Sequence, residues 1–492
     1  MNVNPITRLD YPDPDVIRVE DTYYMVSTTM HFMPGCEILQ SFDLVHWEHA
    51  TYVYETLDHT DAQQLKSGQN IYGQGMWAAS LRYHEGRFCI CFVANDTRKT
   101  YLYTSEKIDG PWKKQLIEGF YHDGSLLFDE DGRNYIVYGN DEIWITELNE
   151  DLTAPKKDGL HRLLVSDHKN PELGYEGSHI QKINGYYYIF LVHSQRDRWM
   201  RTEACFYSDS LEGEFTGGDV LCDDRGYCGQ GVAQGGIVDT PDGKWYAMLF
   251  QDSGAVGRIP ILLPVTWKDH FPFFGQNGHV PEEIEVHSTR PGYIYQPLVG
   301  SDDFCNGLLP RWQFNHDPDP RYYHLDALQG TYTITTREVC TELTQAVNTL
   351  TQRMSYPSCA AEVTVDASAL KEGDVAGLCA LQSCYAAVGI TKHHGKYEVL
   401  MLDKKEDGIL DMTEGTVVES HQMDFRLEAD FCNMKDEARC YYRVNKGDWL
   451  PIGTVHKLYF KLDHFTGCRF GLFCYAAEET GGSACFRDFK YY

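Results

Sequence analysis

The sequence predicts an all-β protein that is built as a five-bladed β-propeller followed by a β-sandwich. The 492 residues include 33 Tyr, 23 Phe and 43 Gly, and aromatic side chains favour strands while glycine favours turns. A chain of this length also exceeds one ordinary core, so at least two domains are expected. A hairpin signal, which is a turn pair followed by an aromatic-rich apolar run, occurs five times. The five turns contain Thr22, Gly86, Gly132, Gly185 and Gly243.

The spacing of these turns matches the length of a propeller blade. Consecutive turns are 64, 46, 53 and 58 residues apart, which suits a four-stranded blade. In the first unit we expect strands over 16–19, 23–28 and 38–41. In the second unit we expect them over 78–83, 87–93 and 101–105. Five such units form the predicted propeller over residues 1–295.

The rhythm of turns stops near Thr289, and residues 290–293 and 300–303 have the composition of a connector. Beyond it, apolar and polar residues alternate in several short runs, which predicts a second all-β unit over residues 300–492, most simply a sandwich. The clearest runs are 359–365, 375–381, 397–402 and 469–474.

The charge and the cysteines exclude several classes of function. A formal net charge of −29 argues against nucleic acid or an anionic membrane as a partner, because both require a basic surface. We expect a small neutral substrate, and homo-oligomerisation stays open. The opening residues 1–5 lack the basic and apolar regions of a signal peptide, and nothing is apolar enough to span a membrane, so we expect a cytoplasmic protein. The 16 cysteines are scattered without a Cys-x-x-Cys pair, which indicates reduced, buried thiols rather than metal ligands or disulfides.

The five repeats share one position that could carry chemistry. Counting back nine residues from each turn leads to Asp13, Trp77, Asp123, Glu176 and Gln234. In a propeller the innermost strands converge on one axis, so these side chains are expected to surround one pocket. Taken singly, the two aspartates read as turn formers and Glu176 as a solvated loop acid. Their convergence favours an active site instead.

Three carboxylates in one concave site predict acid–base chemistry. Like charges raise the pKa of at least one carboxyl, which creates an acid beside a base. Such a pair suits cleavage of a glycosidic bond, in which one group protonates the leaving oxygen and the other activates water. A third carboxylate can orient the acid and keep its pKa high. Trp77 offers a flat apolar wall for a sugar ring, with a plain core tryptophan as the alternative.

Ordered segments along the whole chain resemble glycoside hydrolase family 43. The opening carries the likeness in residues 4–6, 11–16, 23–29, 32–35 and 41–47, and later segments are 76–78, 123–126, 176–179 and 239–246. Residues 348–353 and 377–383 resemble the concanavalin A-like β-sandwich that is appended to β-xylosidase-like members. The resemblance implies an inverting, exo-acting pentosidase.

The resemblance also implies roles for individual residues. Asp13 would be the general base, Asp123 would tune the pKa of its neighbour and orient it, and Glu176 would be the proton donor. Arg258 matches a family arginine that touches the bound sugar, with a salt bridge between blades as the alternative.

Two departures from the family pattern surround the expected pocket. Gln234 stands where many members have a histidine close to a calcium or sodium ion, so a structural calcium is disfavoured and no cofactor is required. Its amide can bind a sugar hydroxyl instead. The segment 29–33 also differs, and His31 within it is a candidate substrate contact or a structural histidine.

Three functions remain open at this point. A β-D-xylosidase acting on xylan-derived oligosaccharides is favoured by the appended sandwich, which we expect to form a lid. An α-L-arabinofuranosidase acting on arabinoxylan fragments is the first alternative, and a non-catalytic carbohydrate-binding propeller is the second. A fructan-cleaving propeller is disfavoured because the chain lacks its Trp-x-Asn-Asp-Pro opening.

Overall fold

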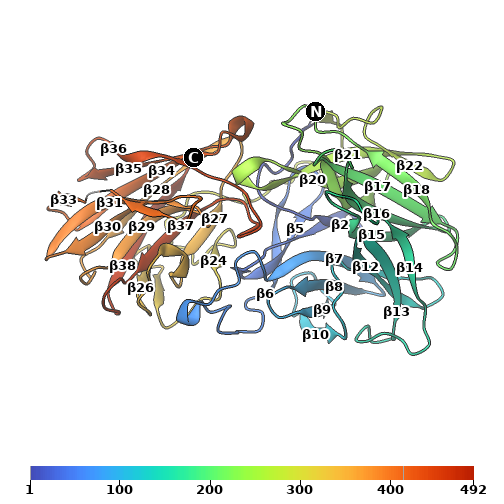
Figure 1. Cartoon of the computed structure of the whole chain (residues 1–492), viewed down its shortest axis with the longest axis horizontal. Helices are drawn as coiled ribbons and strands as arrows, with labels where there is room; N and C mark the ends of the chain where they lie inside the picture. Colours follow the sequence, from blue (N-terminus) through green and yellow to red (C-terminus); the bar gives the residue numbers. More distant parts are fainter. Residues whose placement is uncertain (1, 414) are drawn as a thin grey trace.

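The computed structural model describes residues 2–413 and 415–492, and it contains two β domains that lie side by side (Figure 1). The prediction of an all-β propeller followed by a sandwich is confirmed. Apart from strands, the described residues form four short 3-10 turns: η1 (Lys66–Gly68), η2 (Gly254–Val256), η3 (Leu343–Gln345) and η4 (Cys432–Met434). None of the helices in these ranges is long and apolar enough to cross a bilayer.

Five antiparallel four-stranded sheets form the blades of the propeller. The first two sheets contain β2 (Asp15–Val19), β3 (Thr22–Ser27), β5 (Gly35–Ser41) and β6 (Glu48–Tyr54), then β7 (Met76–His84), β8 (Arg87–Ala94), β9 (Lys99–Ser105) and β10 (Lys113–Ile117). The third contains β11 (Ser125–Phe128), β12 (Asn134–Asn140), β13 (Glu142–Leu148) and β14 (His161–Ser166). The last two contain β15 (Glu176–Ile183), β16 (Tyr186–Ser194), β17 (Arg201–Ser208) and β18 (Thr216–Leu221), then β19 (Val232–Asp239), β20 (Trp245–Asp252), β21 (Arg258–Lys268) and β22 (Phe271–Phe274).

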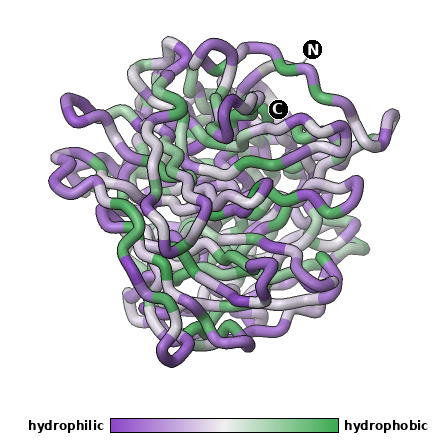
Figure 2. The backbone as a smooth tube through the Cα atoms, turned by 90° about the vertical axis from the view of Figure 1, so that its right-hand side faces the viewer, coloured by the Kyte–Doolittle hydropathy of each residue, from purple (hydrophilic) through white to green (hydrophobic). Residues whose placement is uncertain are grey.

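The first strands of the five blades form the inner ring of the propeller. β2 contacts β7, β7 contacts β11, and the contacts continue through β15 and β19 back to β2. The ring is held by hydrophobic clusters that each lie between two neighbouring blades, as Ile38 and Leu81 do between the first two. Apolar segments accordingly run through the interior and hydrophilic loops lie outside (Figure 2). The ends of this domain pair through β1 (Asn2–Val3) and β23 (Glu283–Ile284).

The second domain consists of two sheets that face each other across one core. One sheet is ordered β32 (Leu410–Met412), β31 (Lys396–Lys404), β30 (Ala386–His393), β29 (Val375–Leu381), β37 (Arg469–Tyr475), β27 (Leu350–Arg353), β24 (Gln313–Asn315) and β4 (Phe32–Met33), with β33 (Thr416–Val418) beside β31. The other is ordered β25 (Tyr323–Asp326), β26 (Thr331–Thr335), β38 (Ser483–Tyr491), β28 (Ser358–Asp366), β34 (Gln422–Asp430), β35 (Glu437–Val444) and β36 (Leu450–Lys457). Leu378, Phe425 and Phe470 are among the residues of their shared core.

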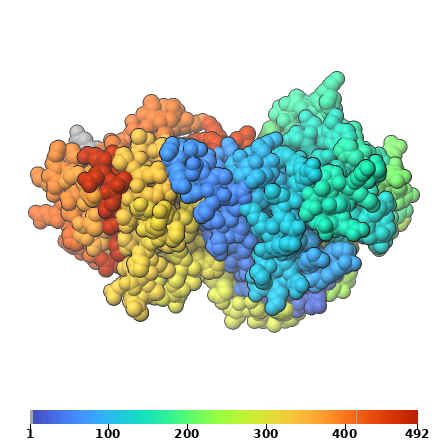
Figure 3. Space-filling model, turned by 90° about the horizontal axis from the view of Figure 1, so that it is seen from below, coloured from blue at the N-terminus to red at the C-terminus, as the bar shows by residue number. Residues whose placement is uncertain are grey.

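One strand crosses the predicted domain boundary. β4 belongs by sequence to the first blade, yet it pairs with β24 of the sandwich, with Phe314 opposite Met33. Nearby, Arg353 of the sandwich forms a buried ion pair with Glu37 of the first blade, with 2.8 Å between Nη1 and Oε2. The two domains therefore share a sheet and a buried charge pair, and their surfaces meet closely in the space-filling view (Figure 3). The 16 cysteines are free thiols, of which 11 are buried, Cys485 is half-buried, and Cys222, Cys228, Cys305 and Cys432 are exposed.

Candidate active site

The candidate site lies at one mouth of the inner ring. Asp13 and Asp123 stand two residues before β2 and β11, Glu176 begins β15, and Trp77 and Gln234 lie near the starts of β7 and β19. Since these five strands contact one another in a closed ring, their first residues lie at the same end. The structure thus brings together the five positions that the nine-residue offset selects.

The backbone at this mouth adopts conformations that ordinary side chains avoid. Asp13, Asp123 and Gln234 have positive φ values of 53°, 48° and 67°. The register of the blade shifts beside Glu176 and again between Ala233 and Gly236. Left-handed conformations of this kind cost on the order of 1–3 kcal/mol each and are concentrated at functional sites. These left-handed residues occupy equivalent positions in the first, third and fifth blades, and they interrupt the extended backbone near the starts of their inner strands.

Asp13 is fixed from both sides. Its Oδ2 accepts a hydrogen bond of 2.6 Å from Thr28 Oγ1, and its Oδ1 accepts one of 3.0 Å from Arg258 Nη1. Only 6% of the residue is exposed. Donors on both oxygens hold the carboxylate in one orientation, which is what a group that must position a water requires.

His122 lies between the other two acids. Its Nε2 is 3.7 Å from Asp123 Oδ2 and 3.6 Å from Glu176 Oε2. The Asp123 carboxylate is the main cause that raises the pKa of His122 to about 9, with a smaller contribution from Glu176. At neutral pH the imidazole is therefore protonated, and it supplies a positive charge inside the cluster of acids.

Asp123 is buried behind this cation. Burial, together with the negative charges of Glu176 and Asp13, raises the pKa of Asp123 to about 6, although His122 opposes the shift. The backbone N–H of Gly177 donates a 3.0 Å hydrogen bond to Asp123 Oδ2. Asp123 thereby touches the segment that carries Glu176, which gives it a direct means of orienting that residue.

Glu176 has a partner that the sequence did not indicate. Asn140 Nδ2 donates a 2.7 Å hydrogen bond to Glu176 Oε2. Asn140 is the last residue of β12, and β12 runs antiparallel to the inner strand β11, so its end reaches the same mouth. Thr28, which follows β3, reaches Asp13 in the same way. The ends of second strands are the signal that would have found both residues.

The backbone of Gln234 is held by a buried acid, Glu203. Its backbone N–H donates a 2.7 Å hydrogen bond to Glu203 Oε2, and burial raises the pKa of Glu203 well above its ordinary range. Gly177, with φ of 66°, lies against the Gln234 side chain, and a Cβ at Gly177 would come within 2.7 Å of Gln234 Cγ. Glycine at 177 therefore allows the fourth and fifth blades to approach closely beside Glu176.

The sandwich domain closes one side of the site with Phe465. Arg258, which is 2% exposed, lies 4.2 Å from the centre of the Phe465 ring and donates a 3.4 Å hydrogen bond to its carbonyl oxygen. The Phe465 ring also lies 5.5 Å from that of Trp77, whose other neighbour is His122 at 6.0 Å. The loop is anchored where Gly467 N–H donates to Asp10 Oδ2 at 2.7 Å.

Comparison with known families decides the identity of this arrangement. Residues 3–272 match the model of glycosyl hydrolases family 43. The chain belongs to glycosyl hydrolase family 43. Residues 301–492 of this family 43 enzyme match the model described as the beta xylosidase C-terminal concanavalin A-like domain. The family and the fold predicted from the sequence are confirmed, and so is the prediction that the protein is a glycoside hydrolase.

Individual relatives are similar over most of the chain. A beta-xylosidase of Formosa agariphila is 26% identical over 98% of this chain and 88% of its own length. A non-reducing end alpha-L-arabinofuranosidase of Bacteroides ovatus is 24% identical, over 83% and 79%. A solved structure described as a bifunctional GH43-CE of Bacteroides eggerthii is 41% identical with a TM-score of 0.93. The match covers 100% of this chain but 63% of that one, so this chain spans less than two thirds of its length.

One candidate residue lies elsewhere in the family 43 enzyme. His31 is completely buried at the interface between the domains, where its ring lies 4.7 Å from Tyr72 and 4.8 Å from His316 of the sandwich. A side chain without accessible surface cannot touch a sugar, so the interpretation of His31 as a substrate contact is replaced by one of interdomain packing. Within the segment 29–33, residues 32–33 form β4, which pairs with the sandwich.

Three residues at the acids have side chains of the kind that can ligate a metal ion. His122, Asp123 and Glu176 bring their ligand atoms within 4.8 Å of one another. The carboxylates raise the pKa of His122 to about 9, so a metal ion would have to displace a proton from the imidazole before His122 could ligate it. At the fifth blade, the carboxyl in contact with the backbone of Gln234 is Glu203, and burial raises its pKa well above the ordinary range, which disfavours the ionised form that a hard cation binds.

Proposed function

We propose that this family 43 enzyme is an inverting exo-glycosidase that releases a terminal pentose from the non-reducing end of xylan-derived oligosaccharides, as a β-D-xylosidase. The observation that carries the proposal is the difference in environment among three acids at one mouth. Asp13 is held by two donors, Glu176 is the more exposed, and Asp123 is buried against the segment that carries Glu176. These environments suit a base, an acid and an orienting residue.

Asp13 acts as the general base. Its fixed orientation lets it accept a proton from a water molecule that attacks the anomeric carbon. Arg258 balances part of its charge through the 3.0 Å ion pair and reaches the same pocket. An inverting mechanism requires about 6.5–9.5 Å between the two working carboxyl groups, which leaves room for that water.

Glu176 acts as the general acid. It protonates the glycosidic oxygen as the bond breaks, while Asn140 holds one of its oxygens. His122 Nε2 lies 3.6 Å from Glu176 Oε2, and Asp123 binds the backbone N–H of the next residue, Gly177, so both neighbours help to position the acid. Because the water that Asp13 activates attacks the face opposite the leaving oxygen in a single displacement, the anomeric configuration is inverted.

Exo action on short substrates follows from the closed side of the site. Phe465 lies against Arg258 and Trp77, and this placement of a sandwich residue beside the acids supports a site for short substrates. The xylosidase assignment is supported by the description of the matched C-terminal domain and by the relative in Formosa agariphila.

An α-L-arabinofuranosidase acting on arabinoxylan fragments is the second candidate. It is supported by the Bacteroides ovatus relative. A solved GH43 structure that is 27% identical with a TM-score of 0.87 is described as an engineered enzyme with both endo-xylanase and exo-arabinofuranosidase activity. The two pentoses present their hydroxyls similarly, so one site can accept both.

The test is release of nitrophenol from the nitrophenyl β-D-xylopyranoside and α-L-arabinofuranoside, side by side, with Glu176→Ala as the control. Preference for the xyloside supports the first candidate, and preference for the arabinofuranoside supports the second. A folded protein that cleaves neither would overturn both and favour a carbohydrate-binding propeller.

A further inference from the structure

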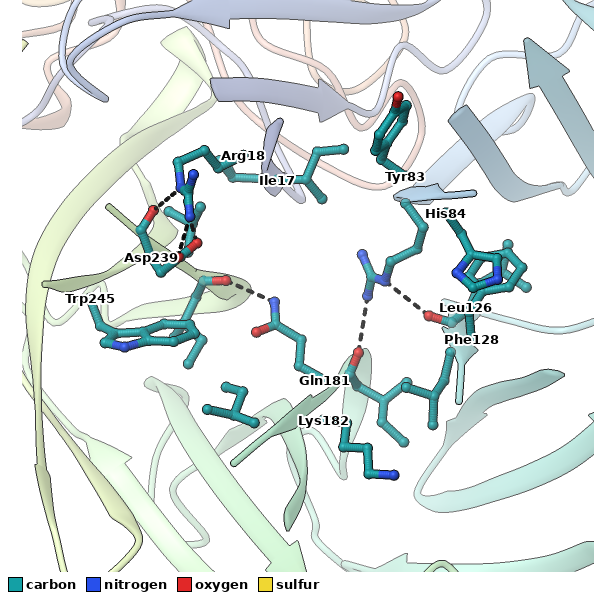
Figure 4. Close-up of a pocket in the computed structure, with 17 residues that line it drawn as sticks. Ile17, Arg18, Tyr83, His84, Leu126, Phe128, Gln181, Lys182, Asp239 and Trp245 are labelled. Atoms are coloured by element: carbon teal, nitrogen blue, oxygen red, sulfur yellow. Dashed lines mark hydrogen bonds and ion pairs between the residues drawn. The ribbon is translucent and has the colours of Figure 1, made fainter. Parts of the chain in front are cut away.

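A cavity occupies the mouth of the propeller that lies opposite the acids. It has a volume of about 410 Å³ and lies among the later residues of all five inner strands, from Arg18 on β2 to Asp239 on β19 (Figure 4). Cavities of about 300–1,000 Å³ are typical of small-molecule sites. Because the acids of the active site stand at the beginnings of the same strands, the cavity and the active site lie at opposite ends of the ring.

A buried polar layer separates the two ends. Arg82 Nη1 lies 2.6 Å from Asp15 Oδ2, and Asp15 also contacts His179 at 3.1 Å. Arg82 further donates to Ser125 Oγ at 2.8 Å and to the carbonyl oxygen of Ile180 at 3.2 Å, so it links four blades. A ligand in this cavity therefore cannot touch the acids at the other mouth.

The charges of the cavity wall are already paired. Arg18 forms an ion pair with Asp239 and donates a 3.2 Å hydrogen bond to its Oδ1. Lys182 lies 2.6 Å from Asp129 Oδ1, and Arg82 is paired with Asp15. A phosphate or a carboxylate would have to displace these partners, whereas the hydroxyls of a neutral ligand can use the N–H groups and lone pairs that the ion pairs leave free.

The remaining wall combines aromatic faces with an amide. His84 stacks on Phe128 with 4.5 Å between ring centres, and Tyr83 is 44% exposed. Trp245 lies on the other side of the cavity, and the amide of Gln181 stands between, donating at 2.8 Å to the carbonyl of Ile237 (Figure 4). Aromatic faces suit the C–H faces of sugar rings. The adjacent donors of Arg18 and acceptors of Asp239 suit neighbouring hydroxyls, each of which both donates and accepts.

We propose that the distal mouth of the propeller is a second, non-catalytic binding site for a short neutral saccharide. Arg18, Asp239 and Gln181 bind its hydroxyls, while Trp245 and the His84–Phe128 stack pack against its rings. The inference does not depend on which pentose the active site prefers.

The test uses the full chain with Glu176→Gln, so that xylotriose stays intact during calorimetric titration and crystal soaking. Two binding events are expected, with sugar density against Trp245 at the distal mouth. Adding Trp245→Ala should weaken one event by about tenfold or more, the size of effect seen for a buried aromatic anchor. Trp144→Ala is the matched control, because Trp144 stacks on His161 outside the cavity and should leave both events unchanged.

Several outcomes would overturn the inference. These are a single binding event confined to the acids, a Trp245→Ala protein that keeps both events, or inorganic phosphate binding at the distal mouth. If Trp245→Ala does not fold, Gln181→Ala replaces it with the same expectation. Absence of any xylotriose binding would count against the proposed function as well, whereas loss of the distal event alone counts only against the second site.

Discussion

The two mouths of the propeller are built from the same five strands but differ in how their charges are compensated. At the active mouth, three carboxylates share Arg258 and His122, and three residues adopt left-handed backbone conformations. At the distal mouth, Arg18, Lys182 and Arg82 each have a carboxylate partner. The repeat therefore supplies equivalent positions, and the active mouth differs because its three carboxylates outnumber the two cations beside them.

Removal of the base should produce the largest effect. Asp13→Asn is expected to lower kcat by up to about 10⁴-fold on every substrate, because the attacking water loses its proton acceptor. Asp239→Asn, which removes the same charge at the distal mouth, is the matched control and should retain activity. Steady-state rates on nitrophenyl xyloside and on xylobiose test this. Comparable losses of kcat in the two variants would contradict the assignment of catalysis to the active mouth alone.

Removal of the acid should depend on the leaving group. Glu176→Gln is expected to lower kcat on xylobiose by about 10²–10⁴-fold, the usual range for a general acid. The loss on the nitrophenyl substrate should be much smaller, because nitrophenolate departs without protonation. The ratio of the two losses is the quantity to measure, and a ratio near one would remove Glu176 from the acid role.

The cation between the acids should make stability and activity depend on pH. The folded state raises the pKa of His122 to about 9, above its ordinary value of 6.5. Its stabilisation is therefore fully present below pH 6.5 and is lost as pH rises through 9. His122→Phe should melt at a lower temperature than the parent at pH 6, and the difference should shrink above pH 9. The alkaline limb of the activity profile should also move to higher pH, since a nearby cation favours ionised acids.

Thermal melts at pH 6 and 9.5, with activity profiles of both proteins, measure this effect. An equal melting difference at the two pH values would contradict the charge of His122 and leave only a packing role.

The smallest effect is expected at the distal ion pair. The side chains of Arg18 and Asp239 are 22% and 37% exposed, and ion pairs of this kind contribute about 0–1 kcal/mol. Arg18→Ala should therefore change the free energy of unfolding by no more than about this amount and leave nitrophenyl xyloside hydrolysis nearly unchanged. A large loss of activity would show that the buried layer around Arg82 transmits changes between the mouths.

The repeat made much of this arrangement predictable from the sequence. A constant offset found Asp13, Asp123 and Glu176, because equivalent turns put equivalent residues at one end of the ring. The offset could not find Asn140, because that residue ends the second strand of its blade. It could not find His122 either, because the role of that residue follows from its distances to Asp123 and Glu176 in the folded protein. Phe465 comes from the other domain, and β4 pairs across the boundary, so both depend on a docking geometry that carries no local signal. The burial of His31 depends on the same docking geometry, which is why the sequence left its substrate-contact and structural interpretations open.

The measurement that tests the central claim most directly is the configuration of the sugar first released. Proton NMR during the first turnovers on a β-D-xyloside, before mutarotation, distinguishes the two anomers. If Asp13 activates water opposite the bond that Glu176 protonates, α-xylose appears first. Initial release of β-xylose would require a covalent intermediate and would contradict the assignment of Asp13 as a base.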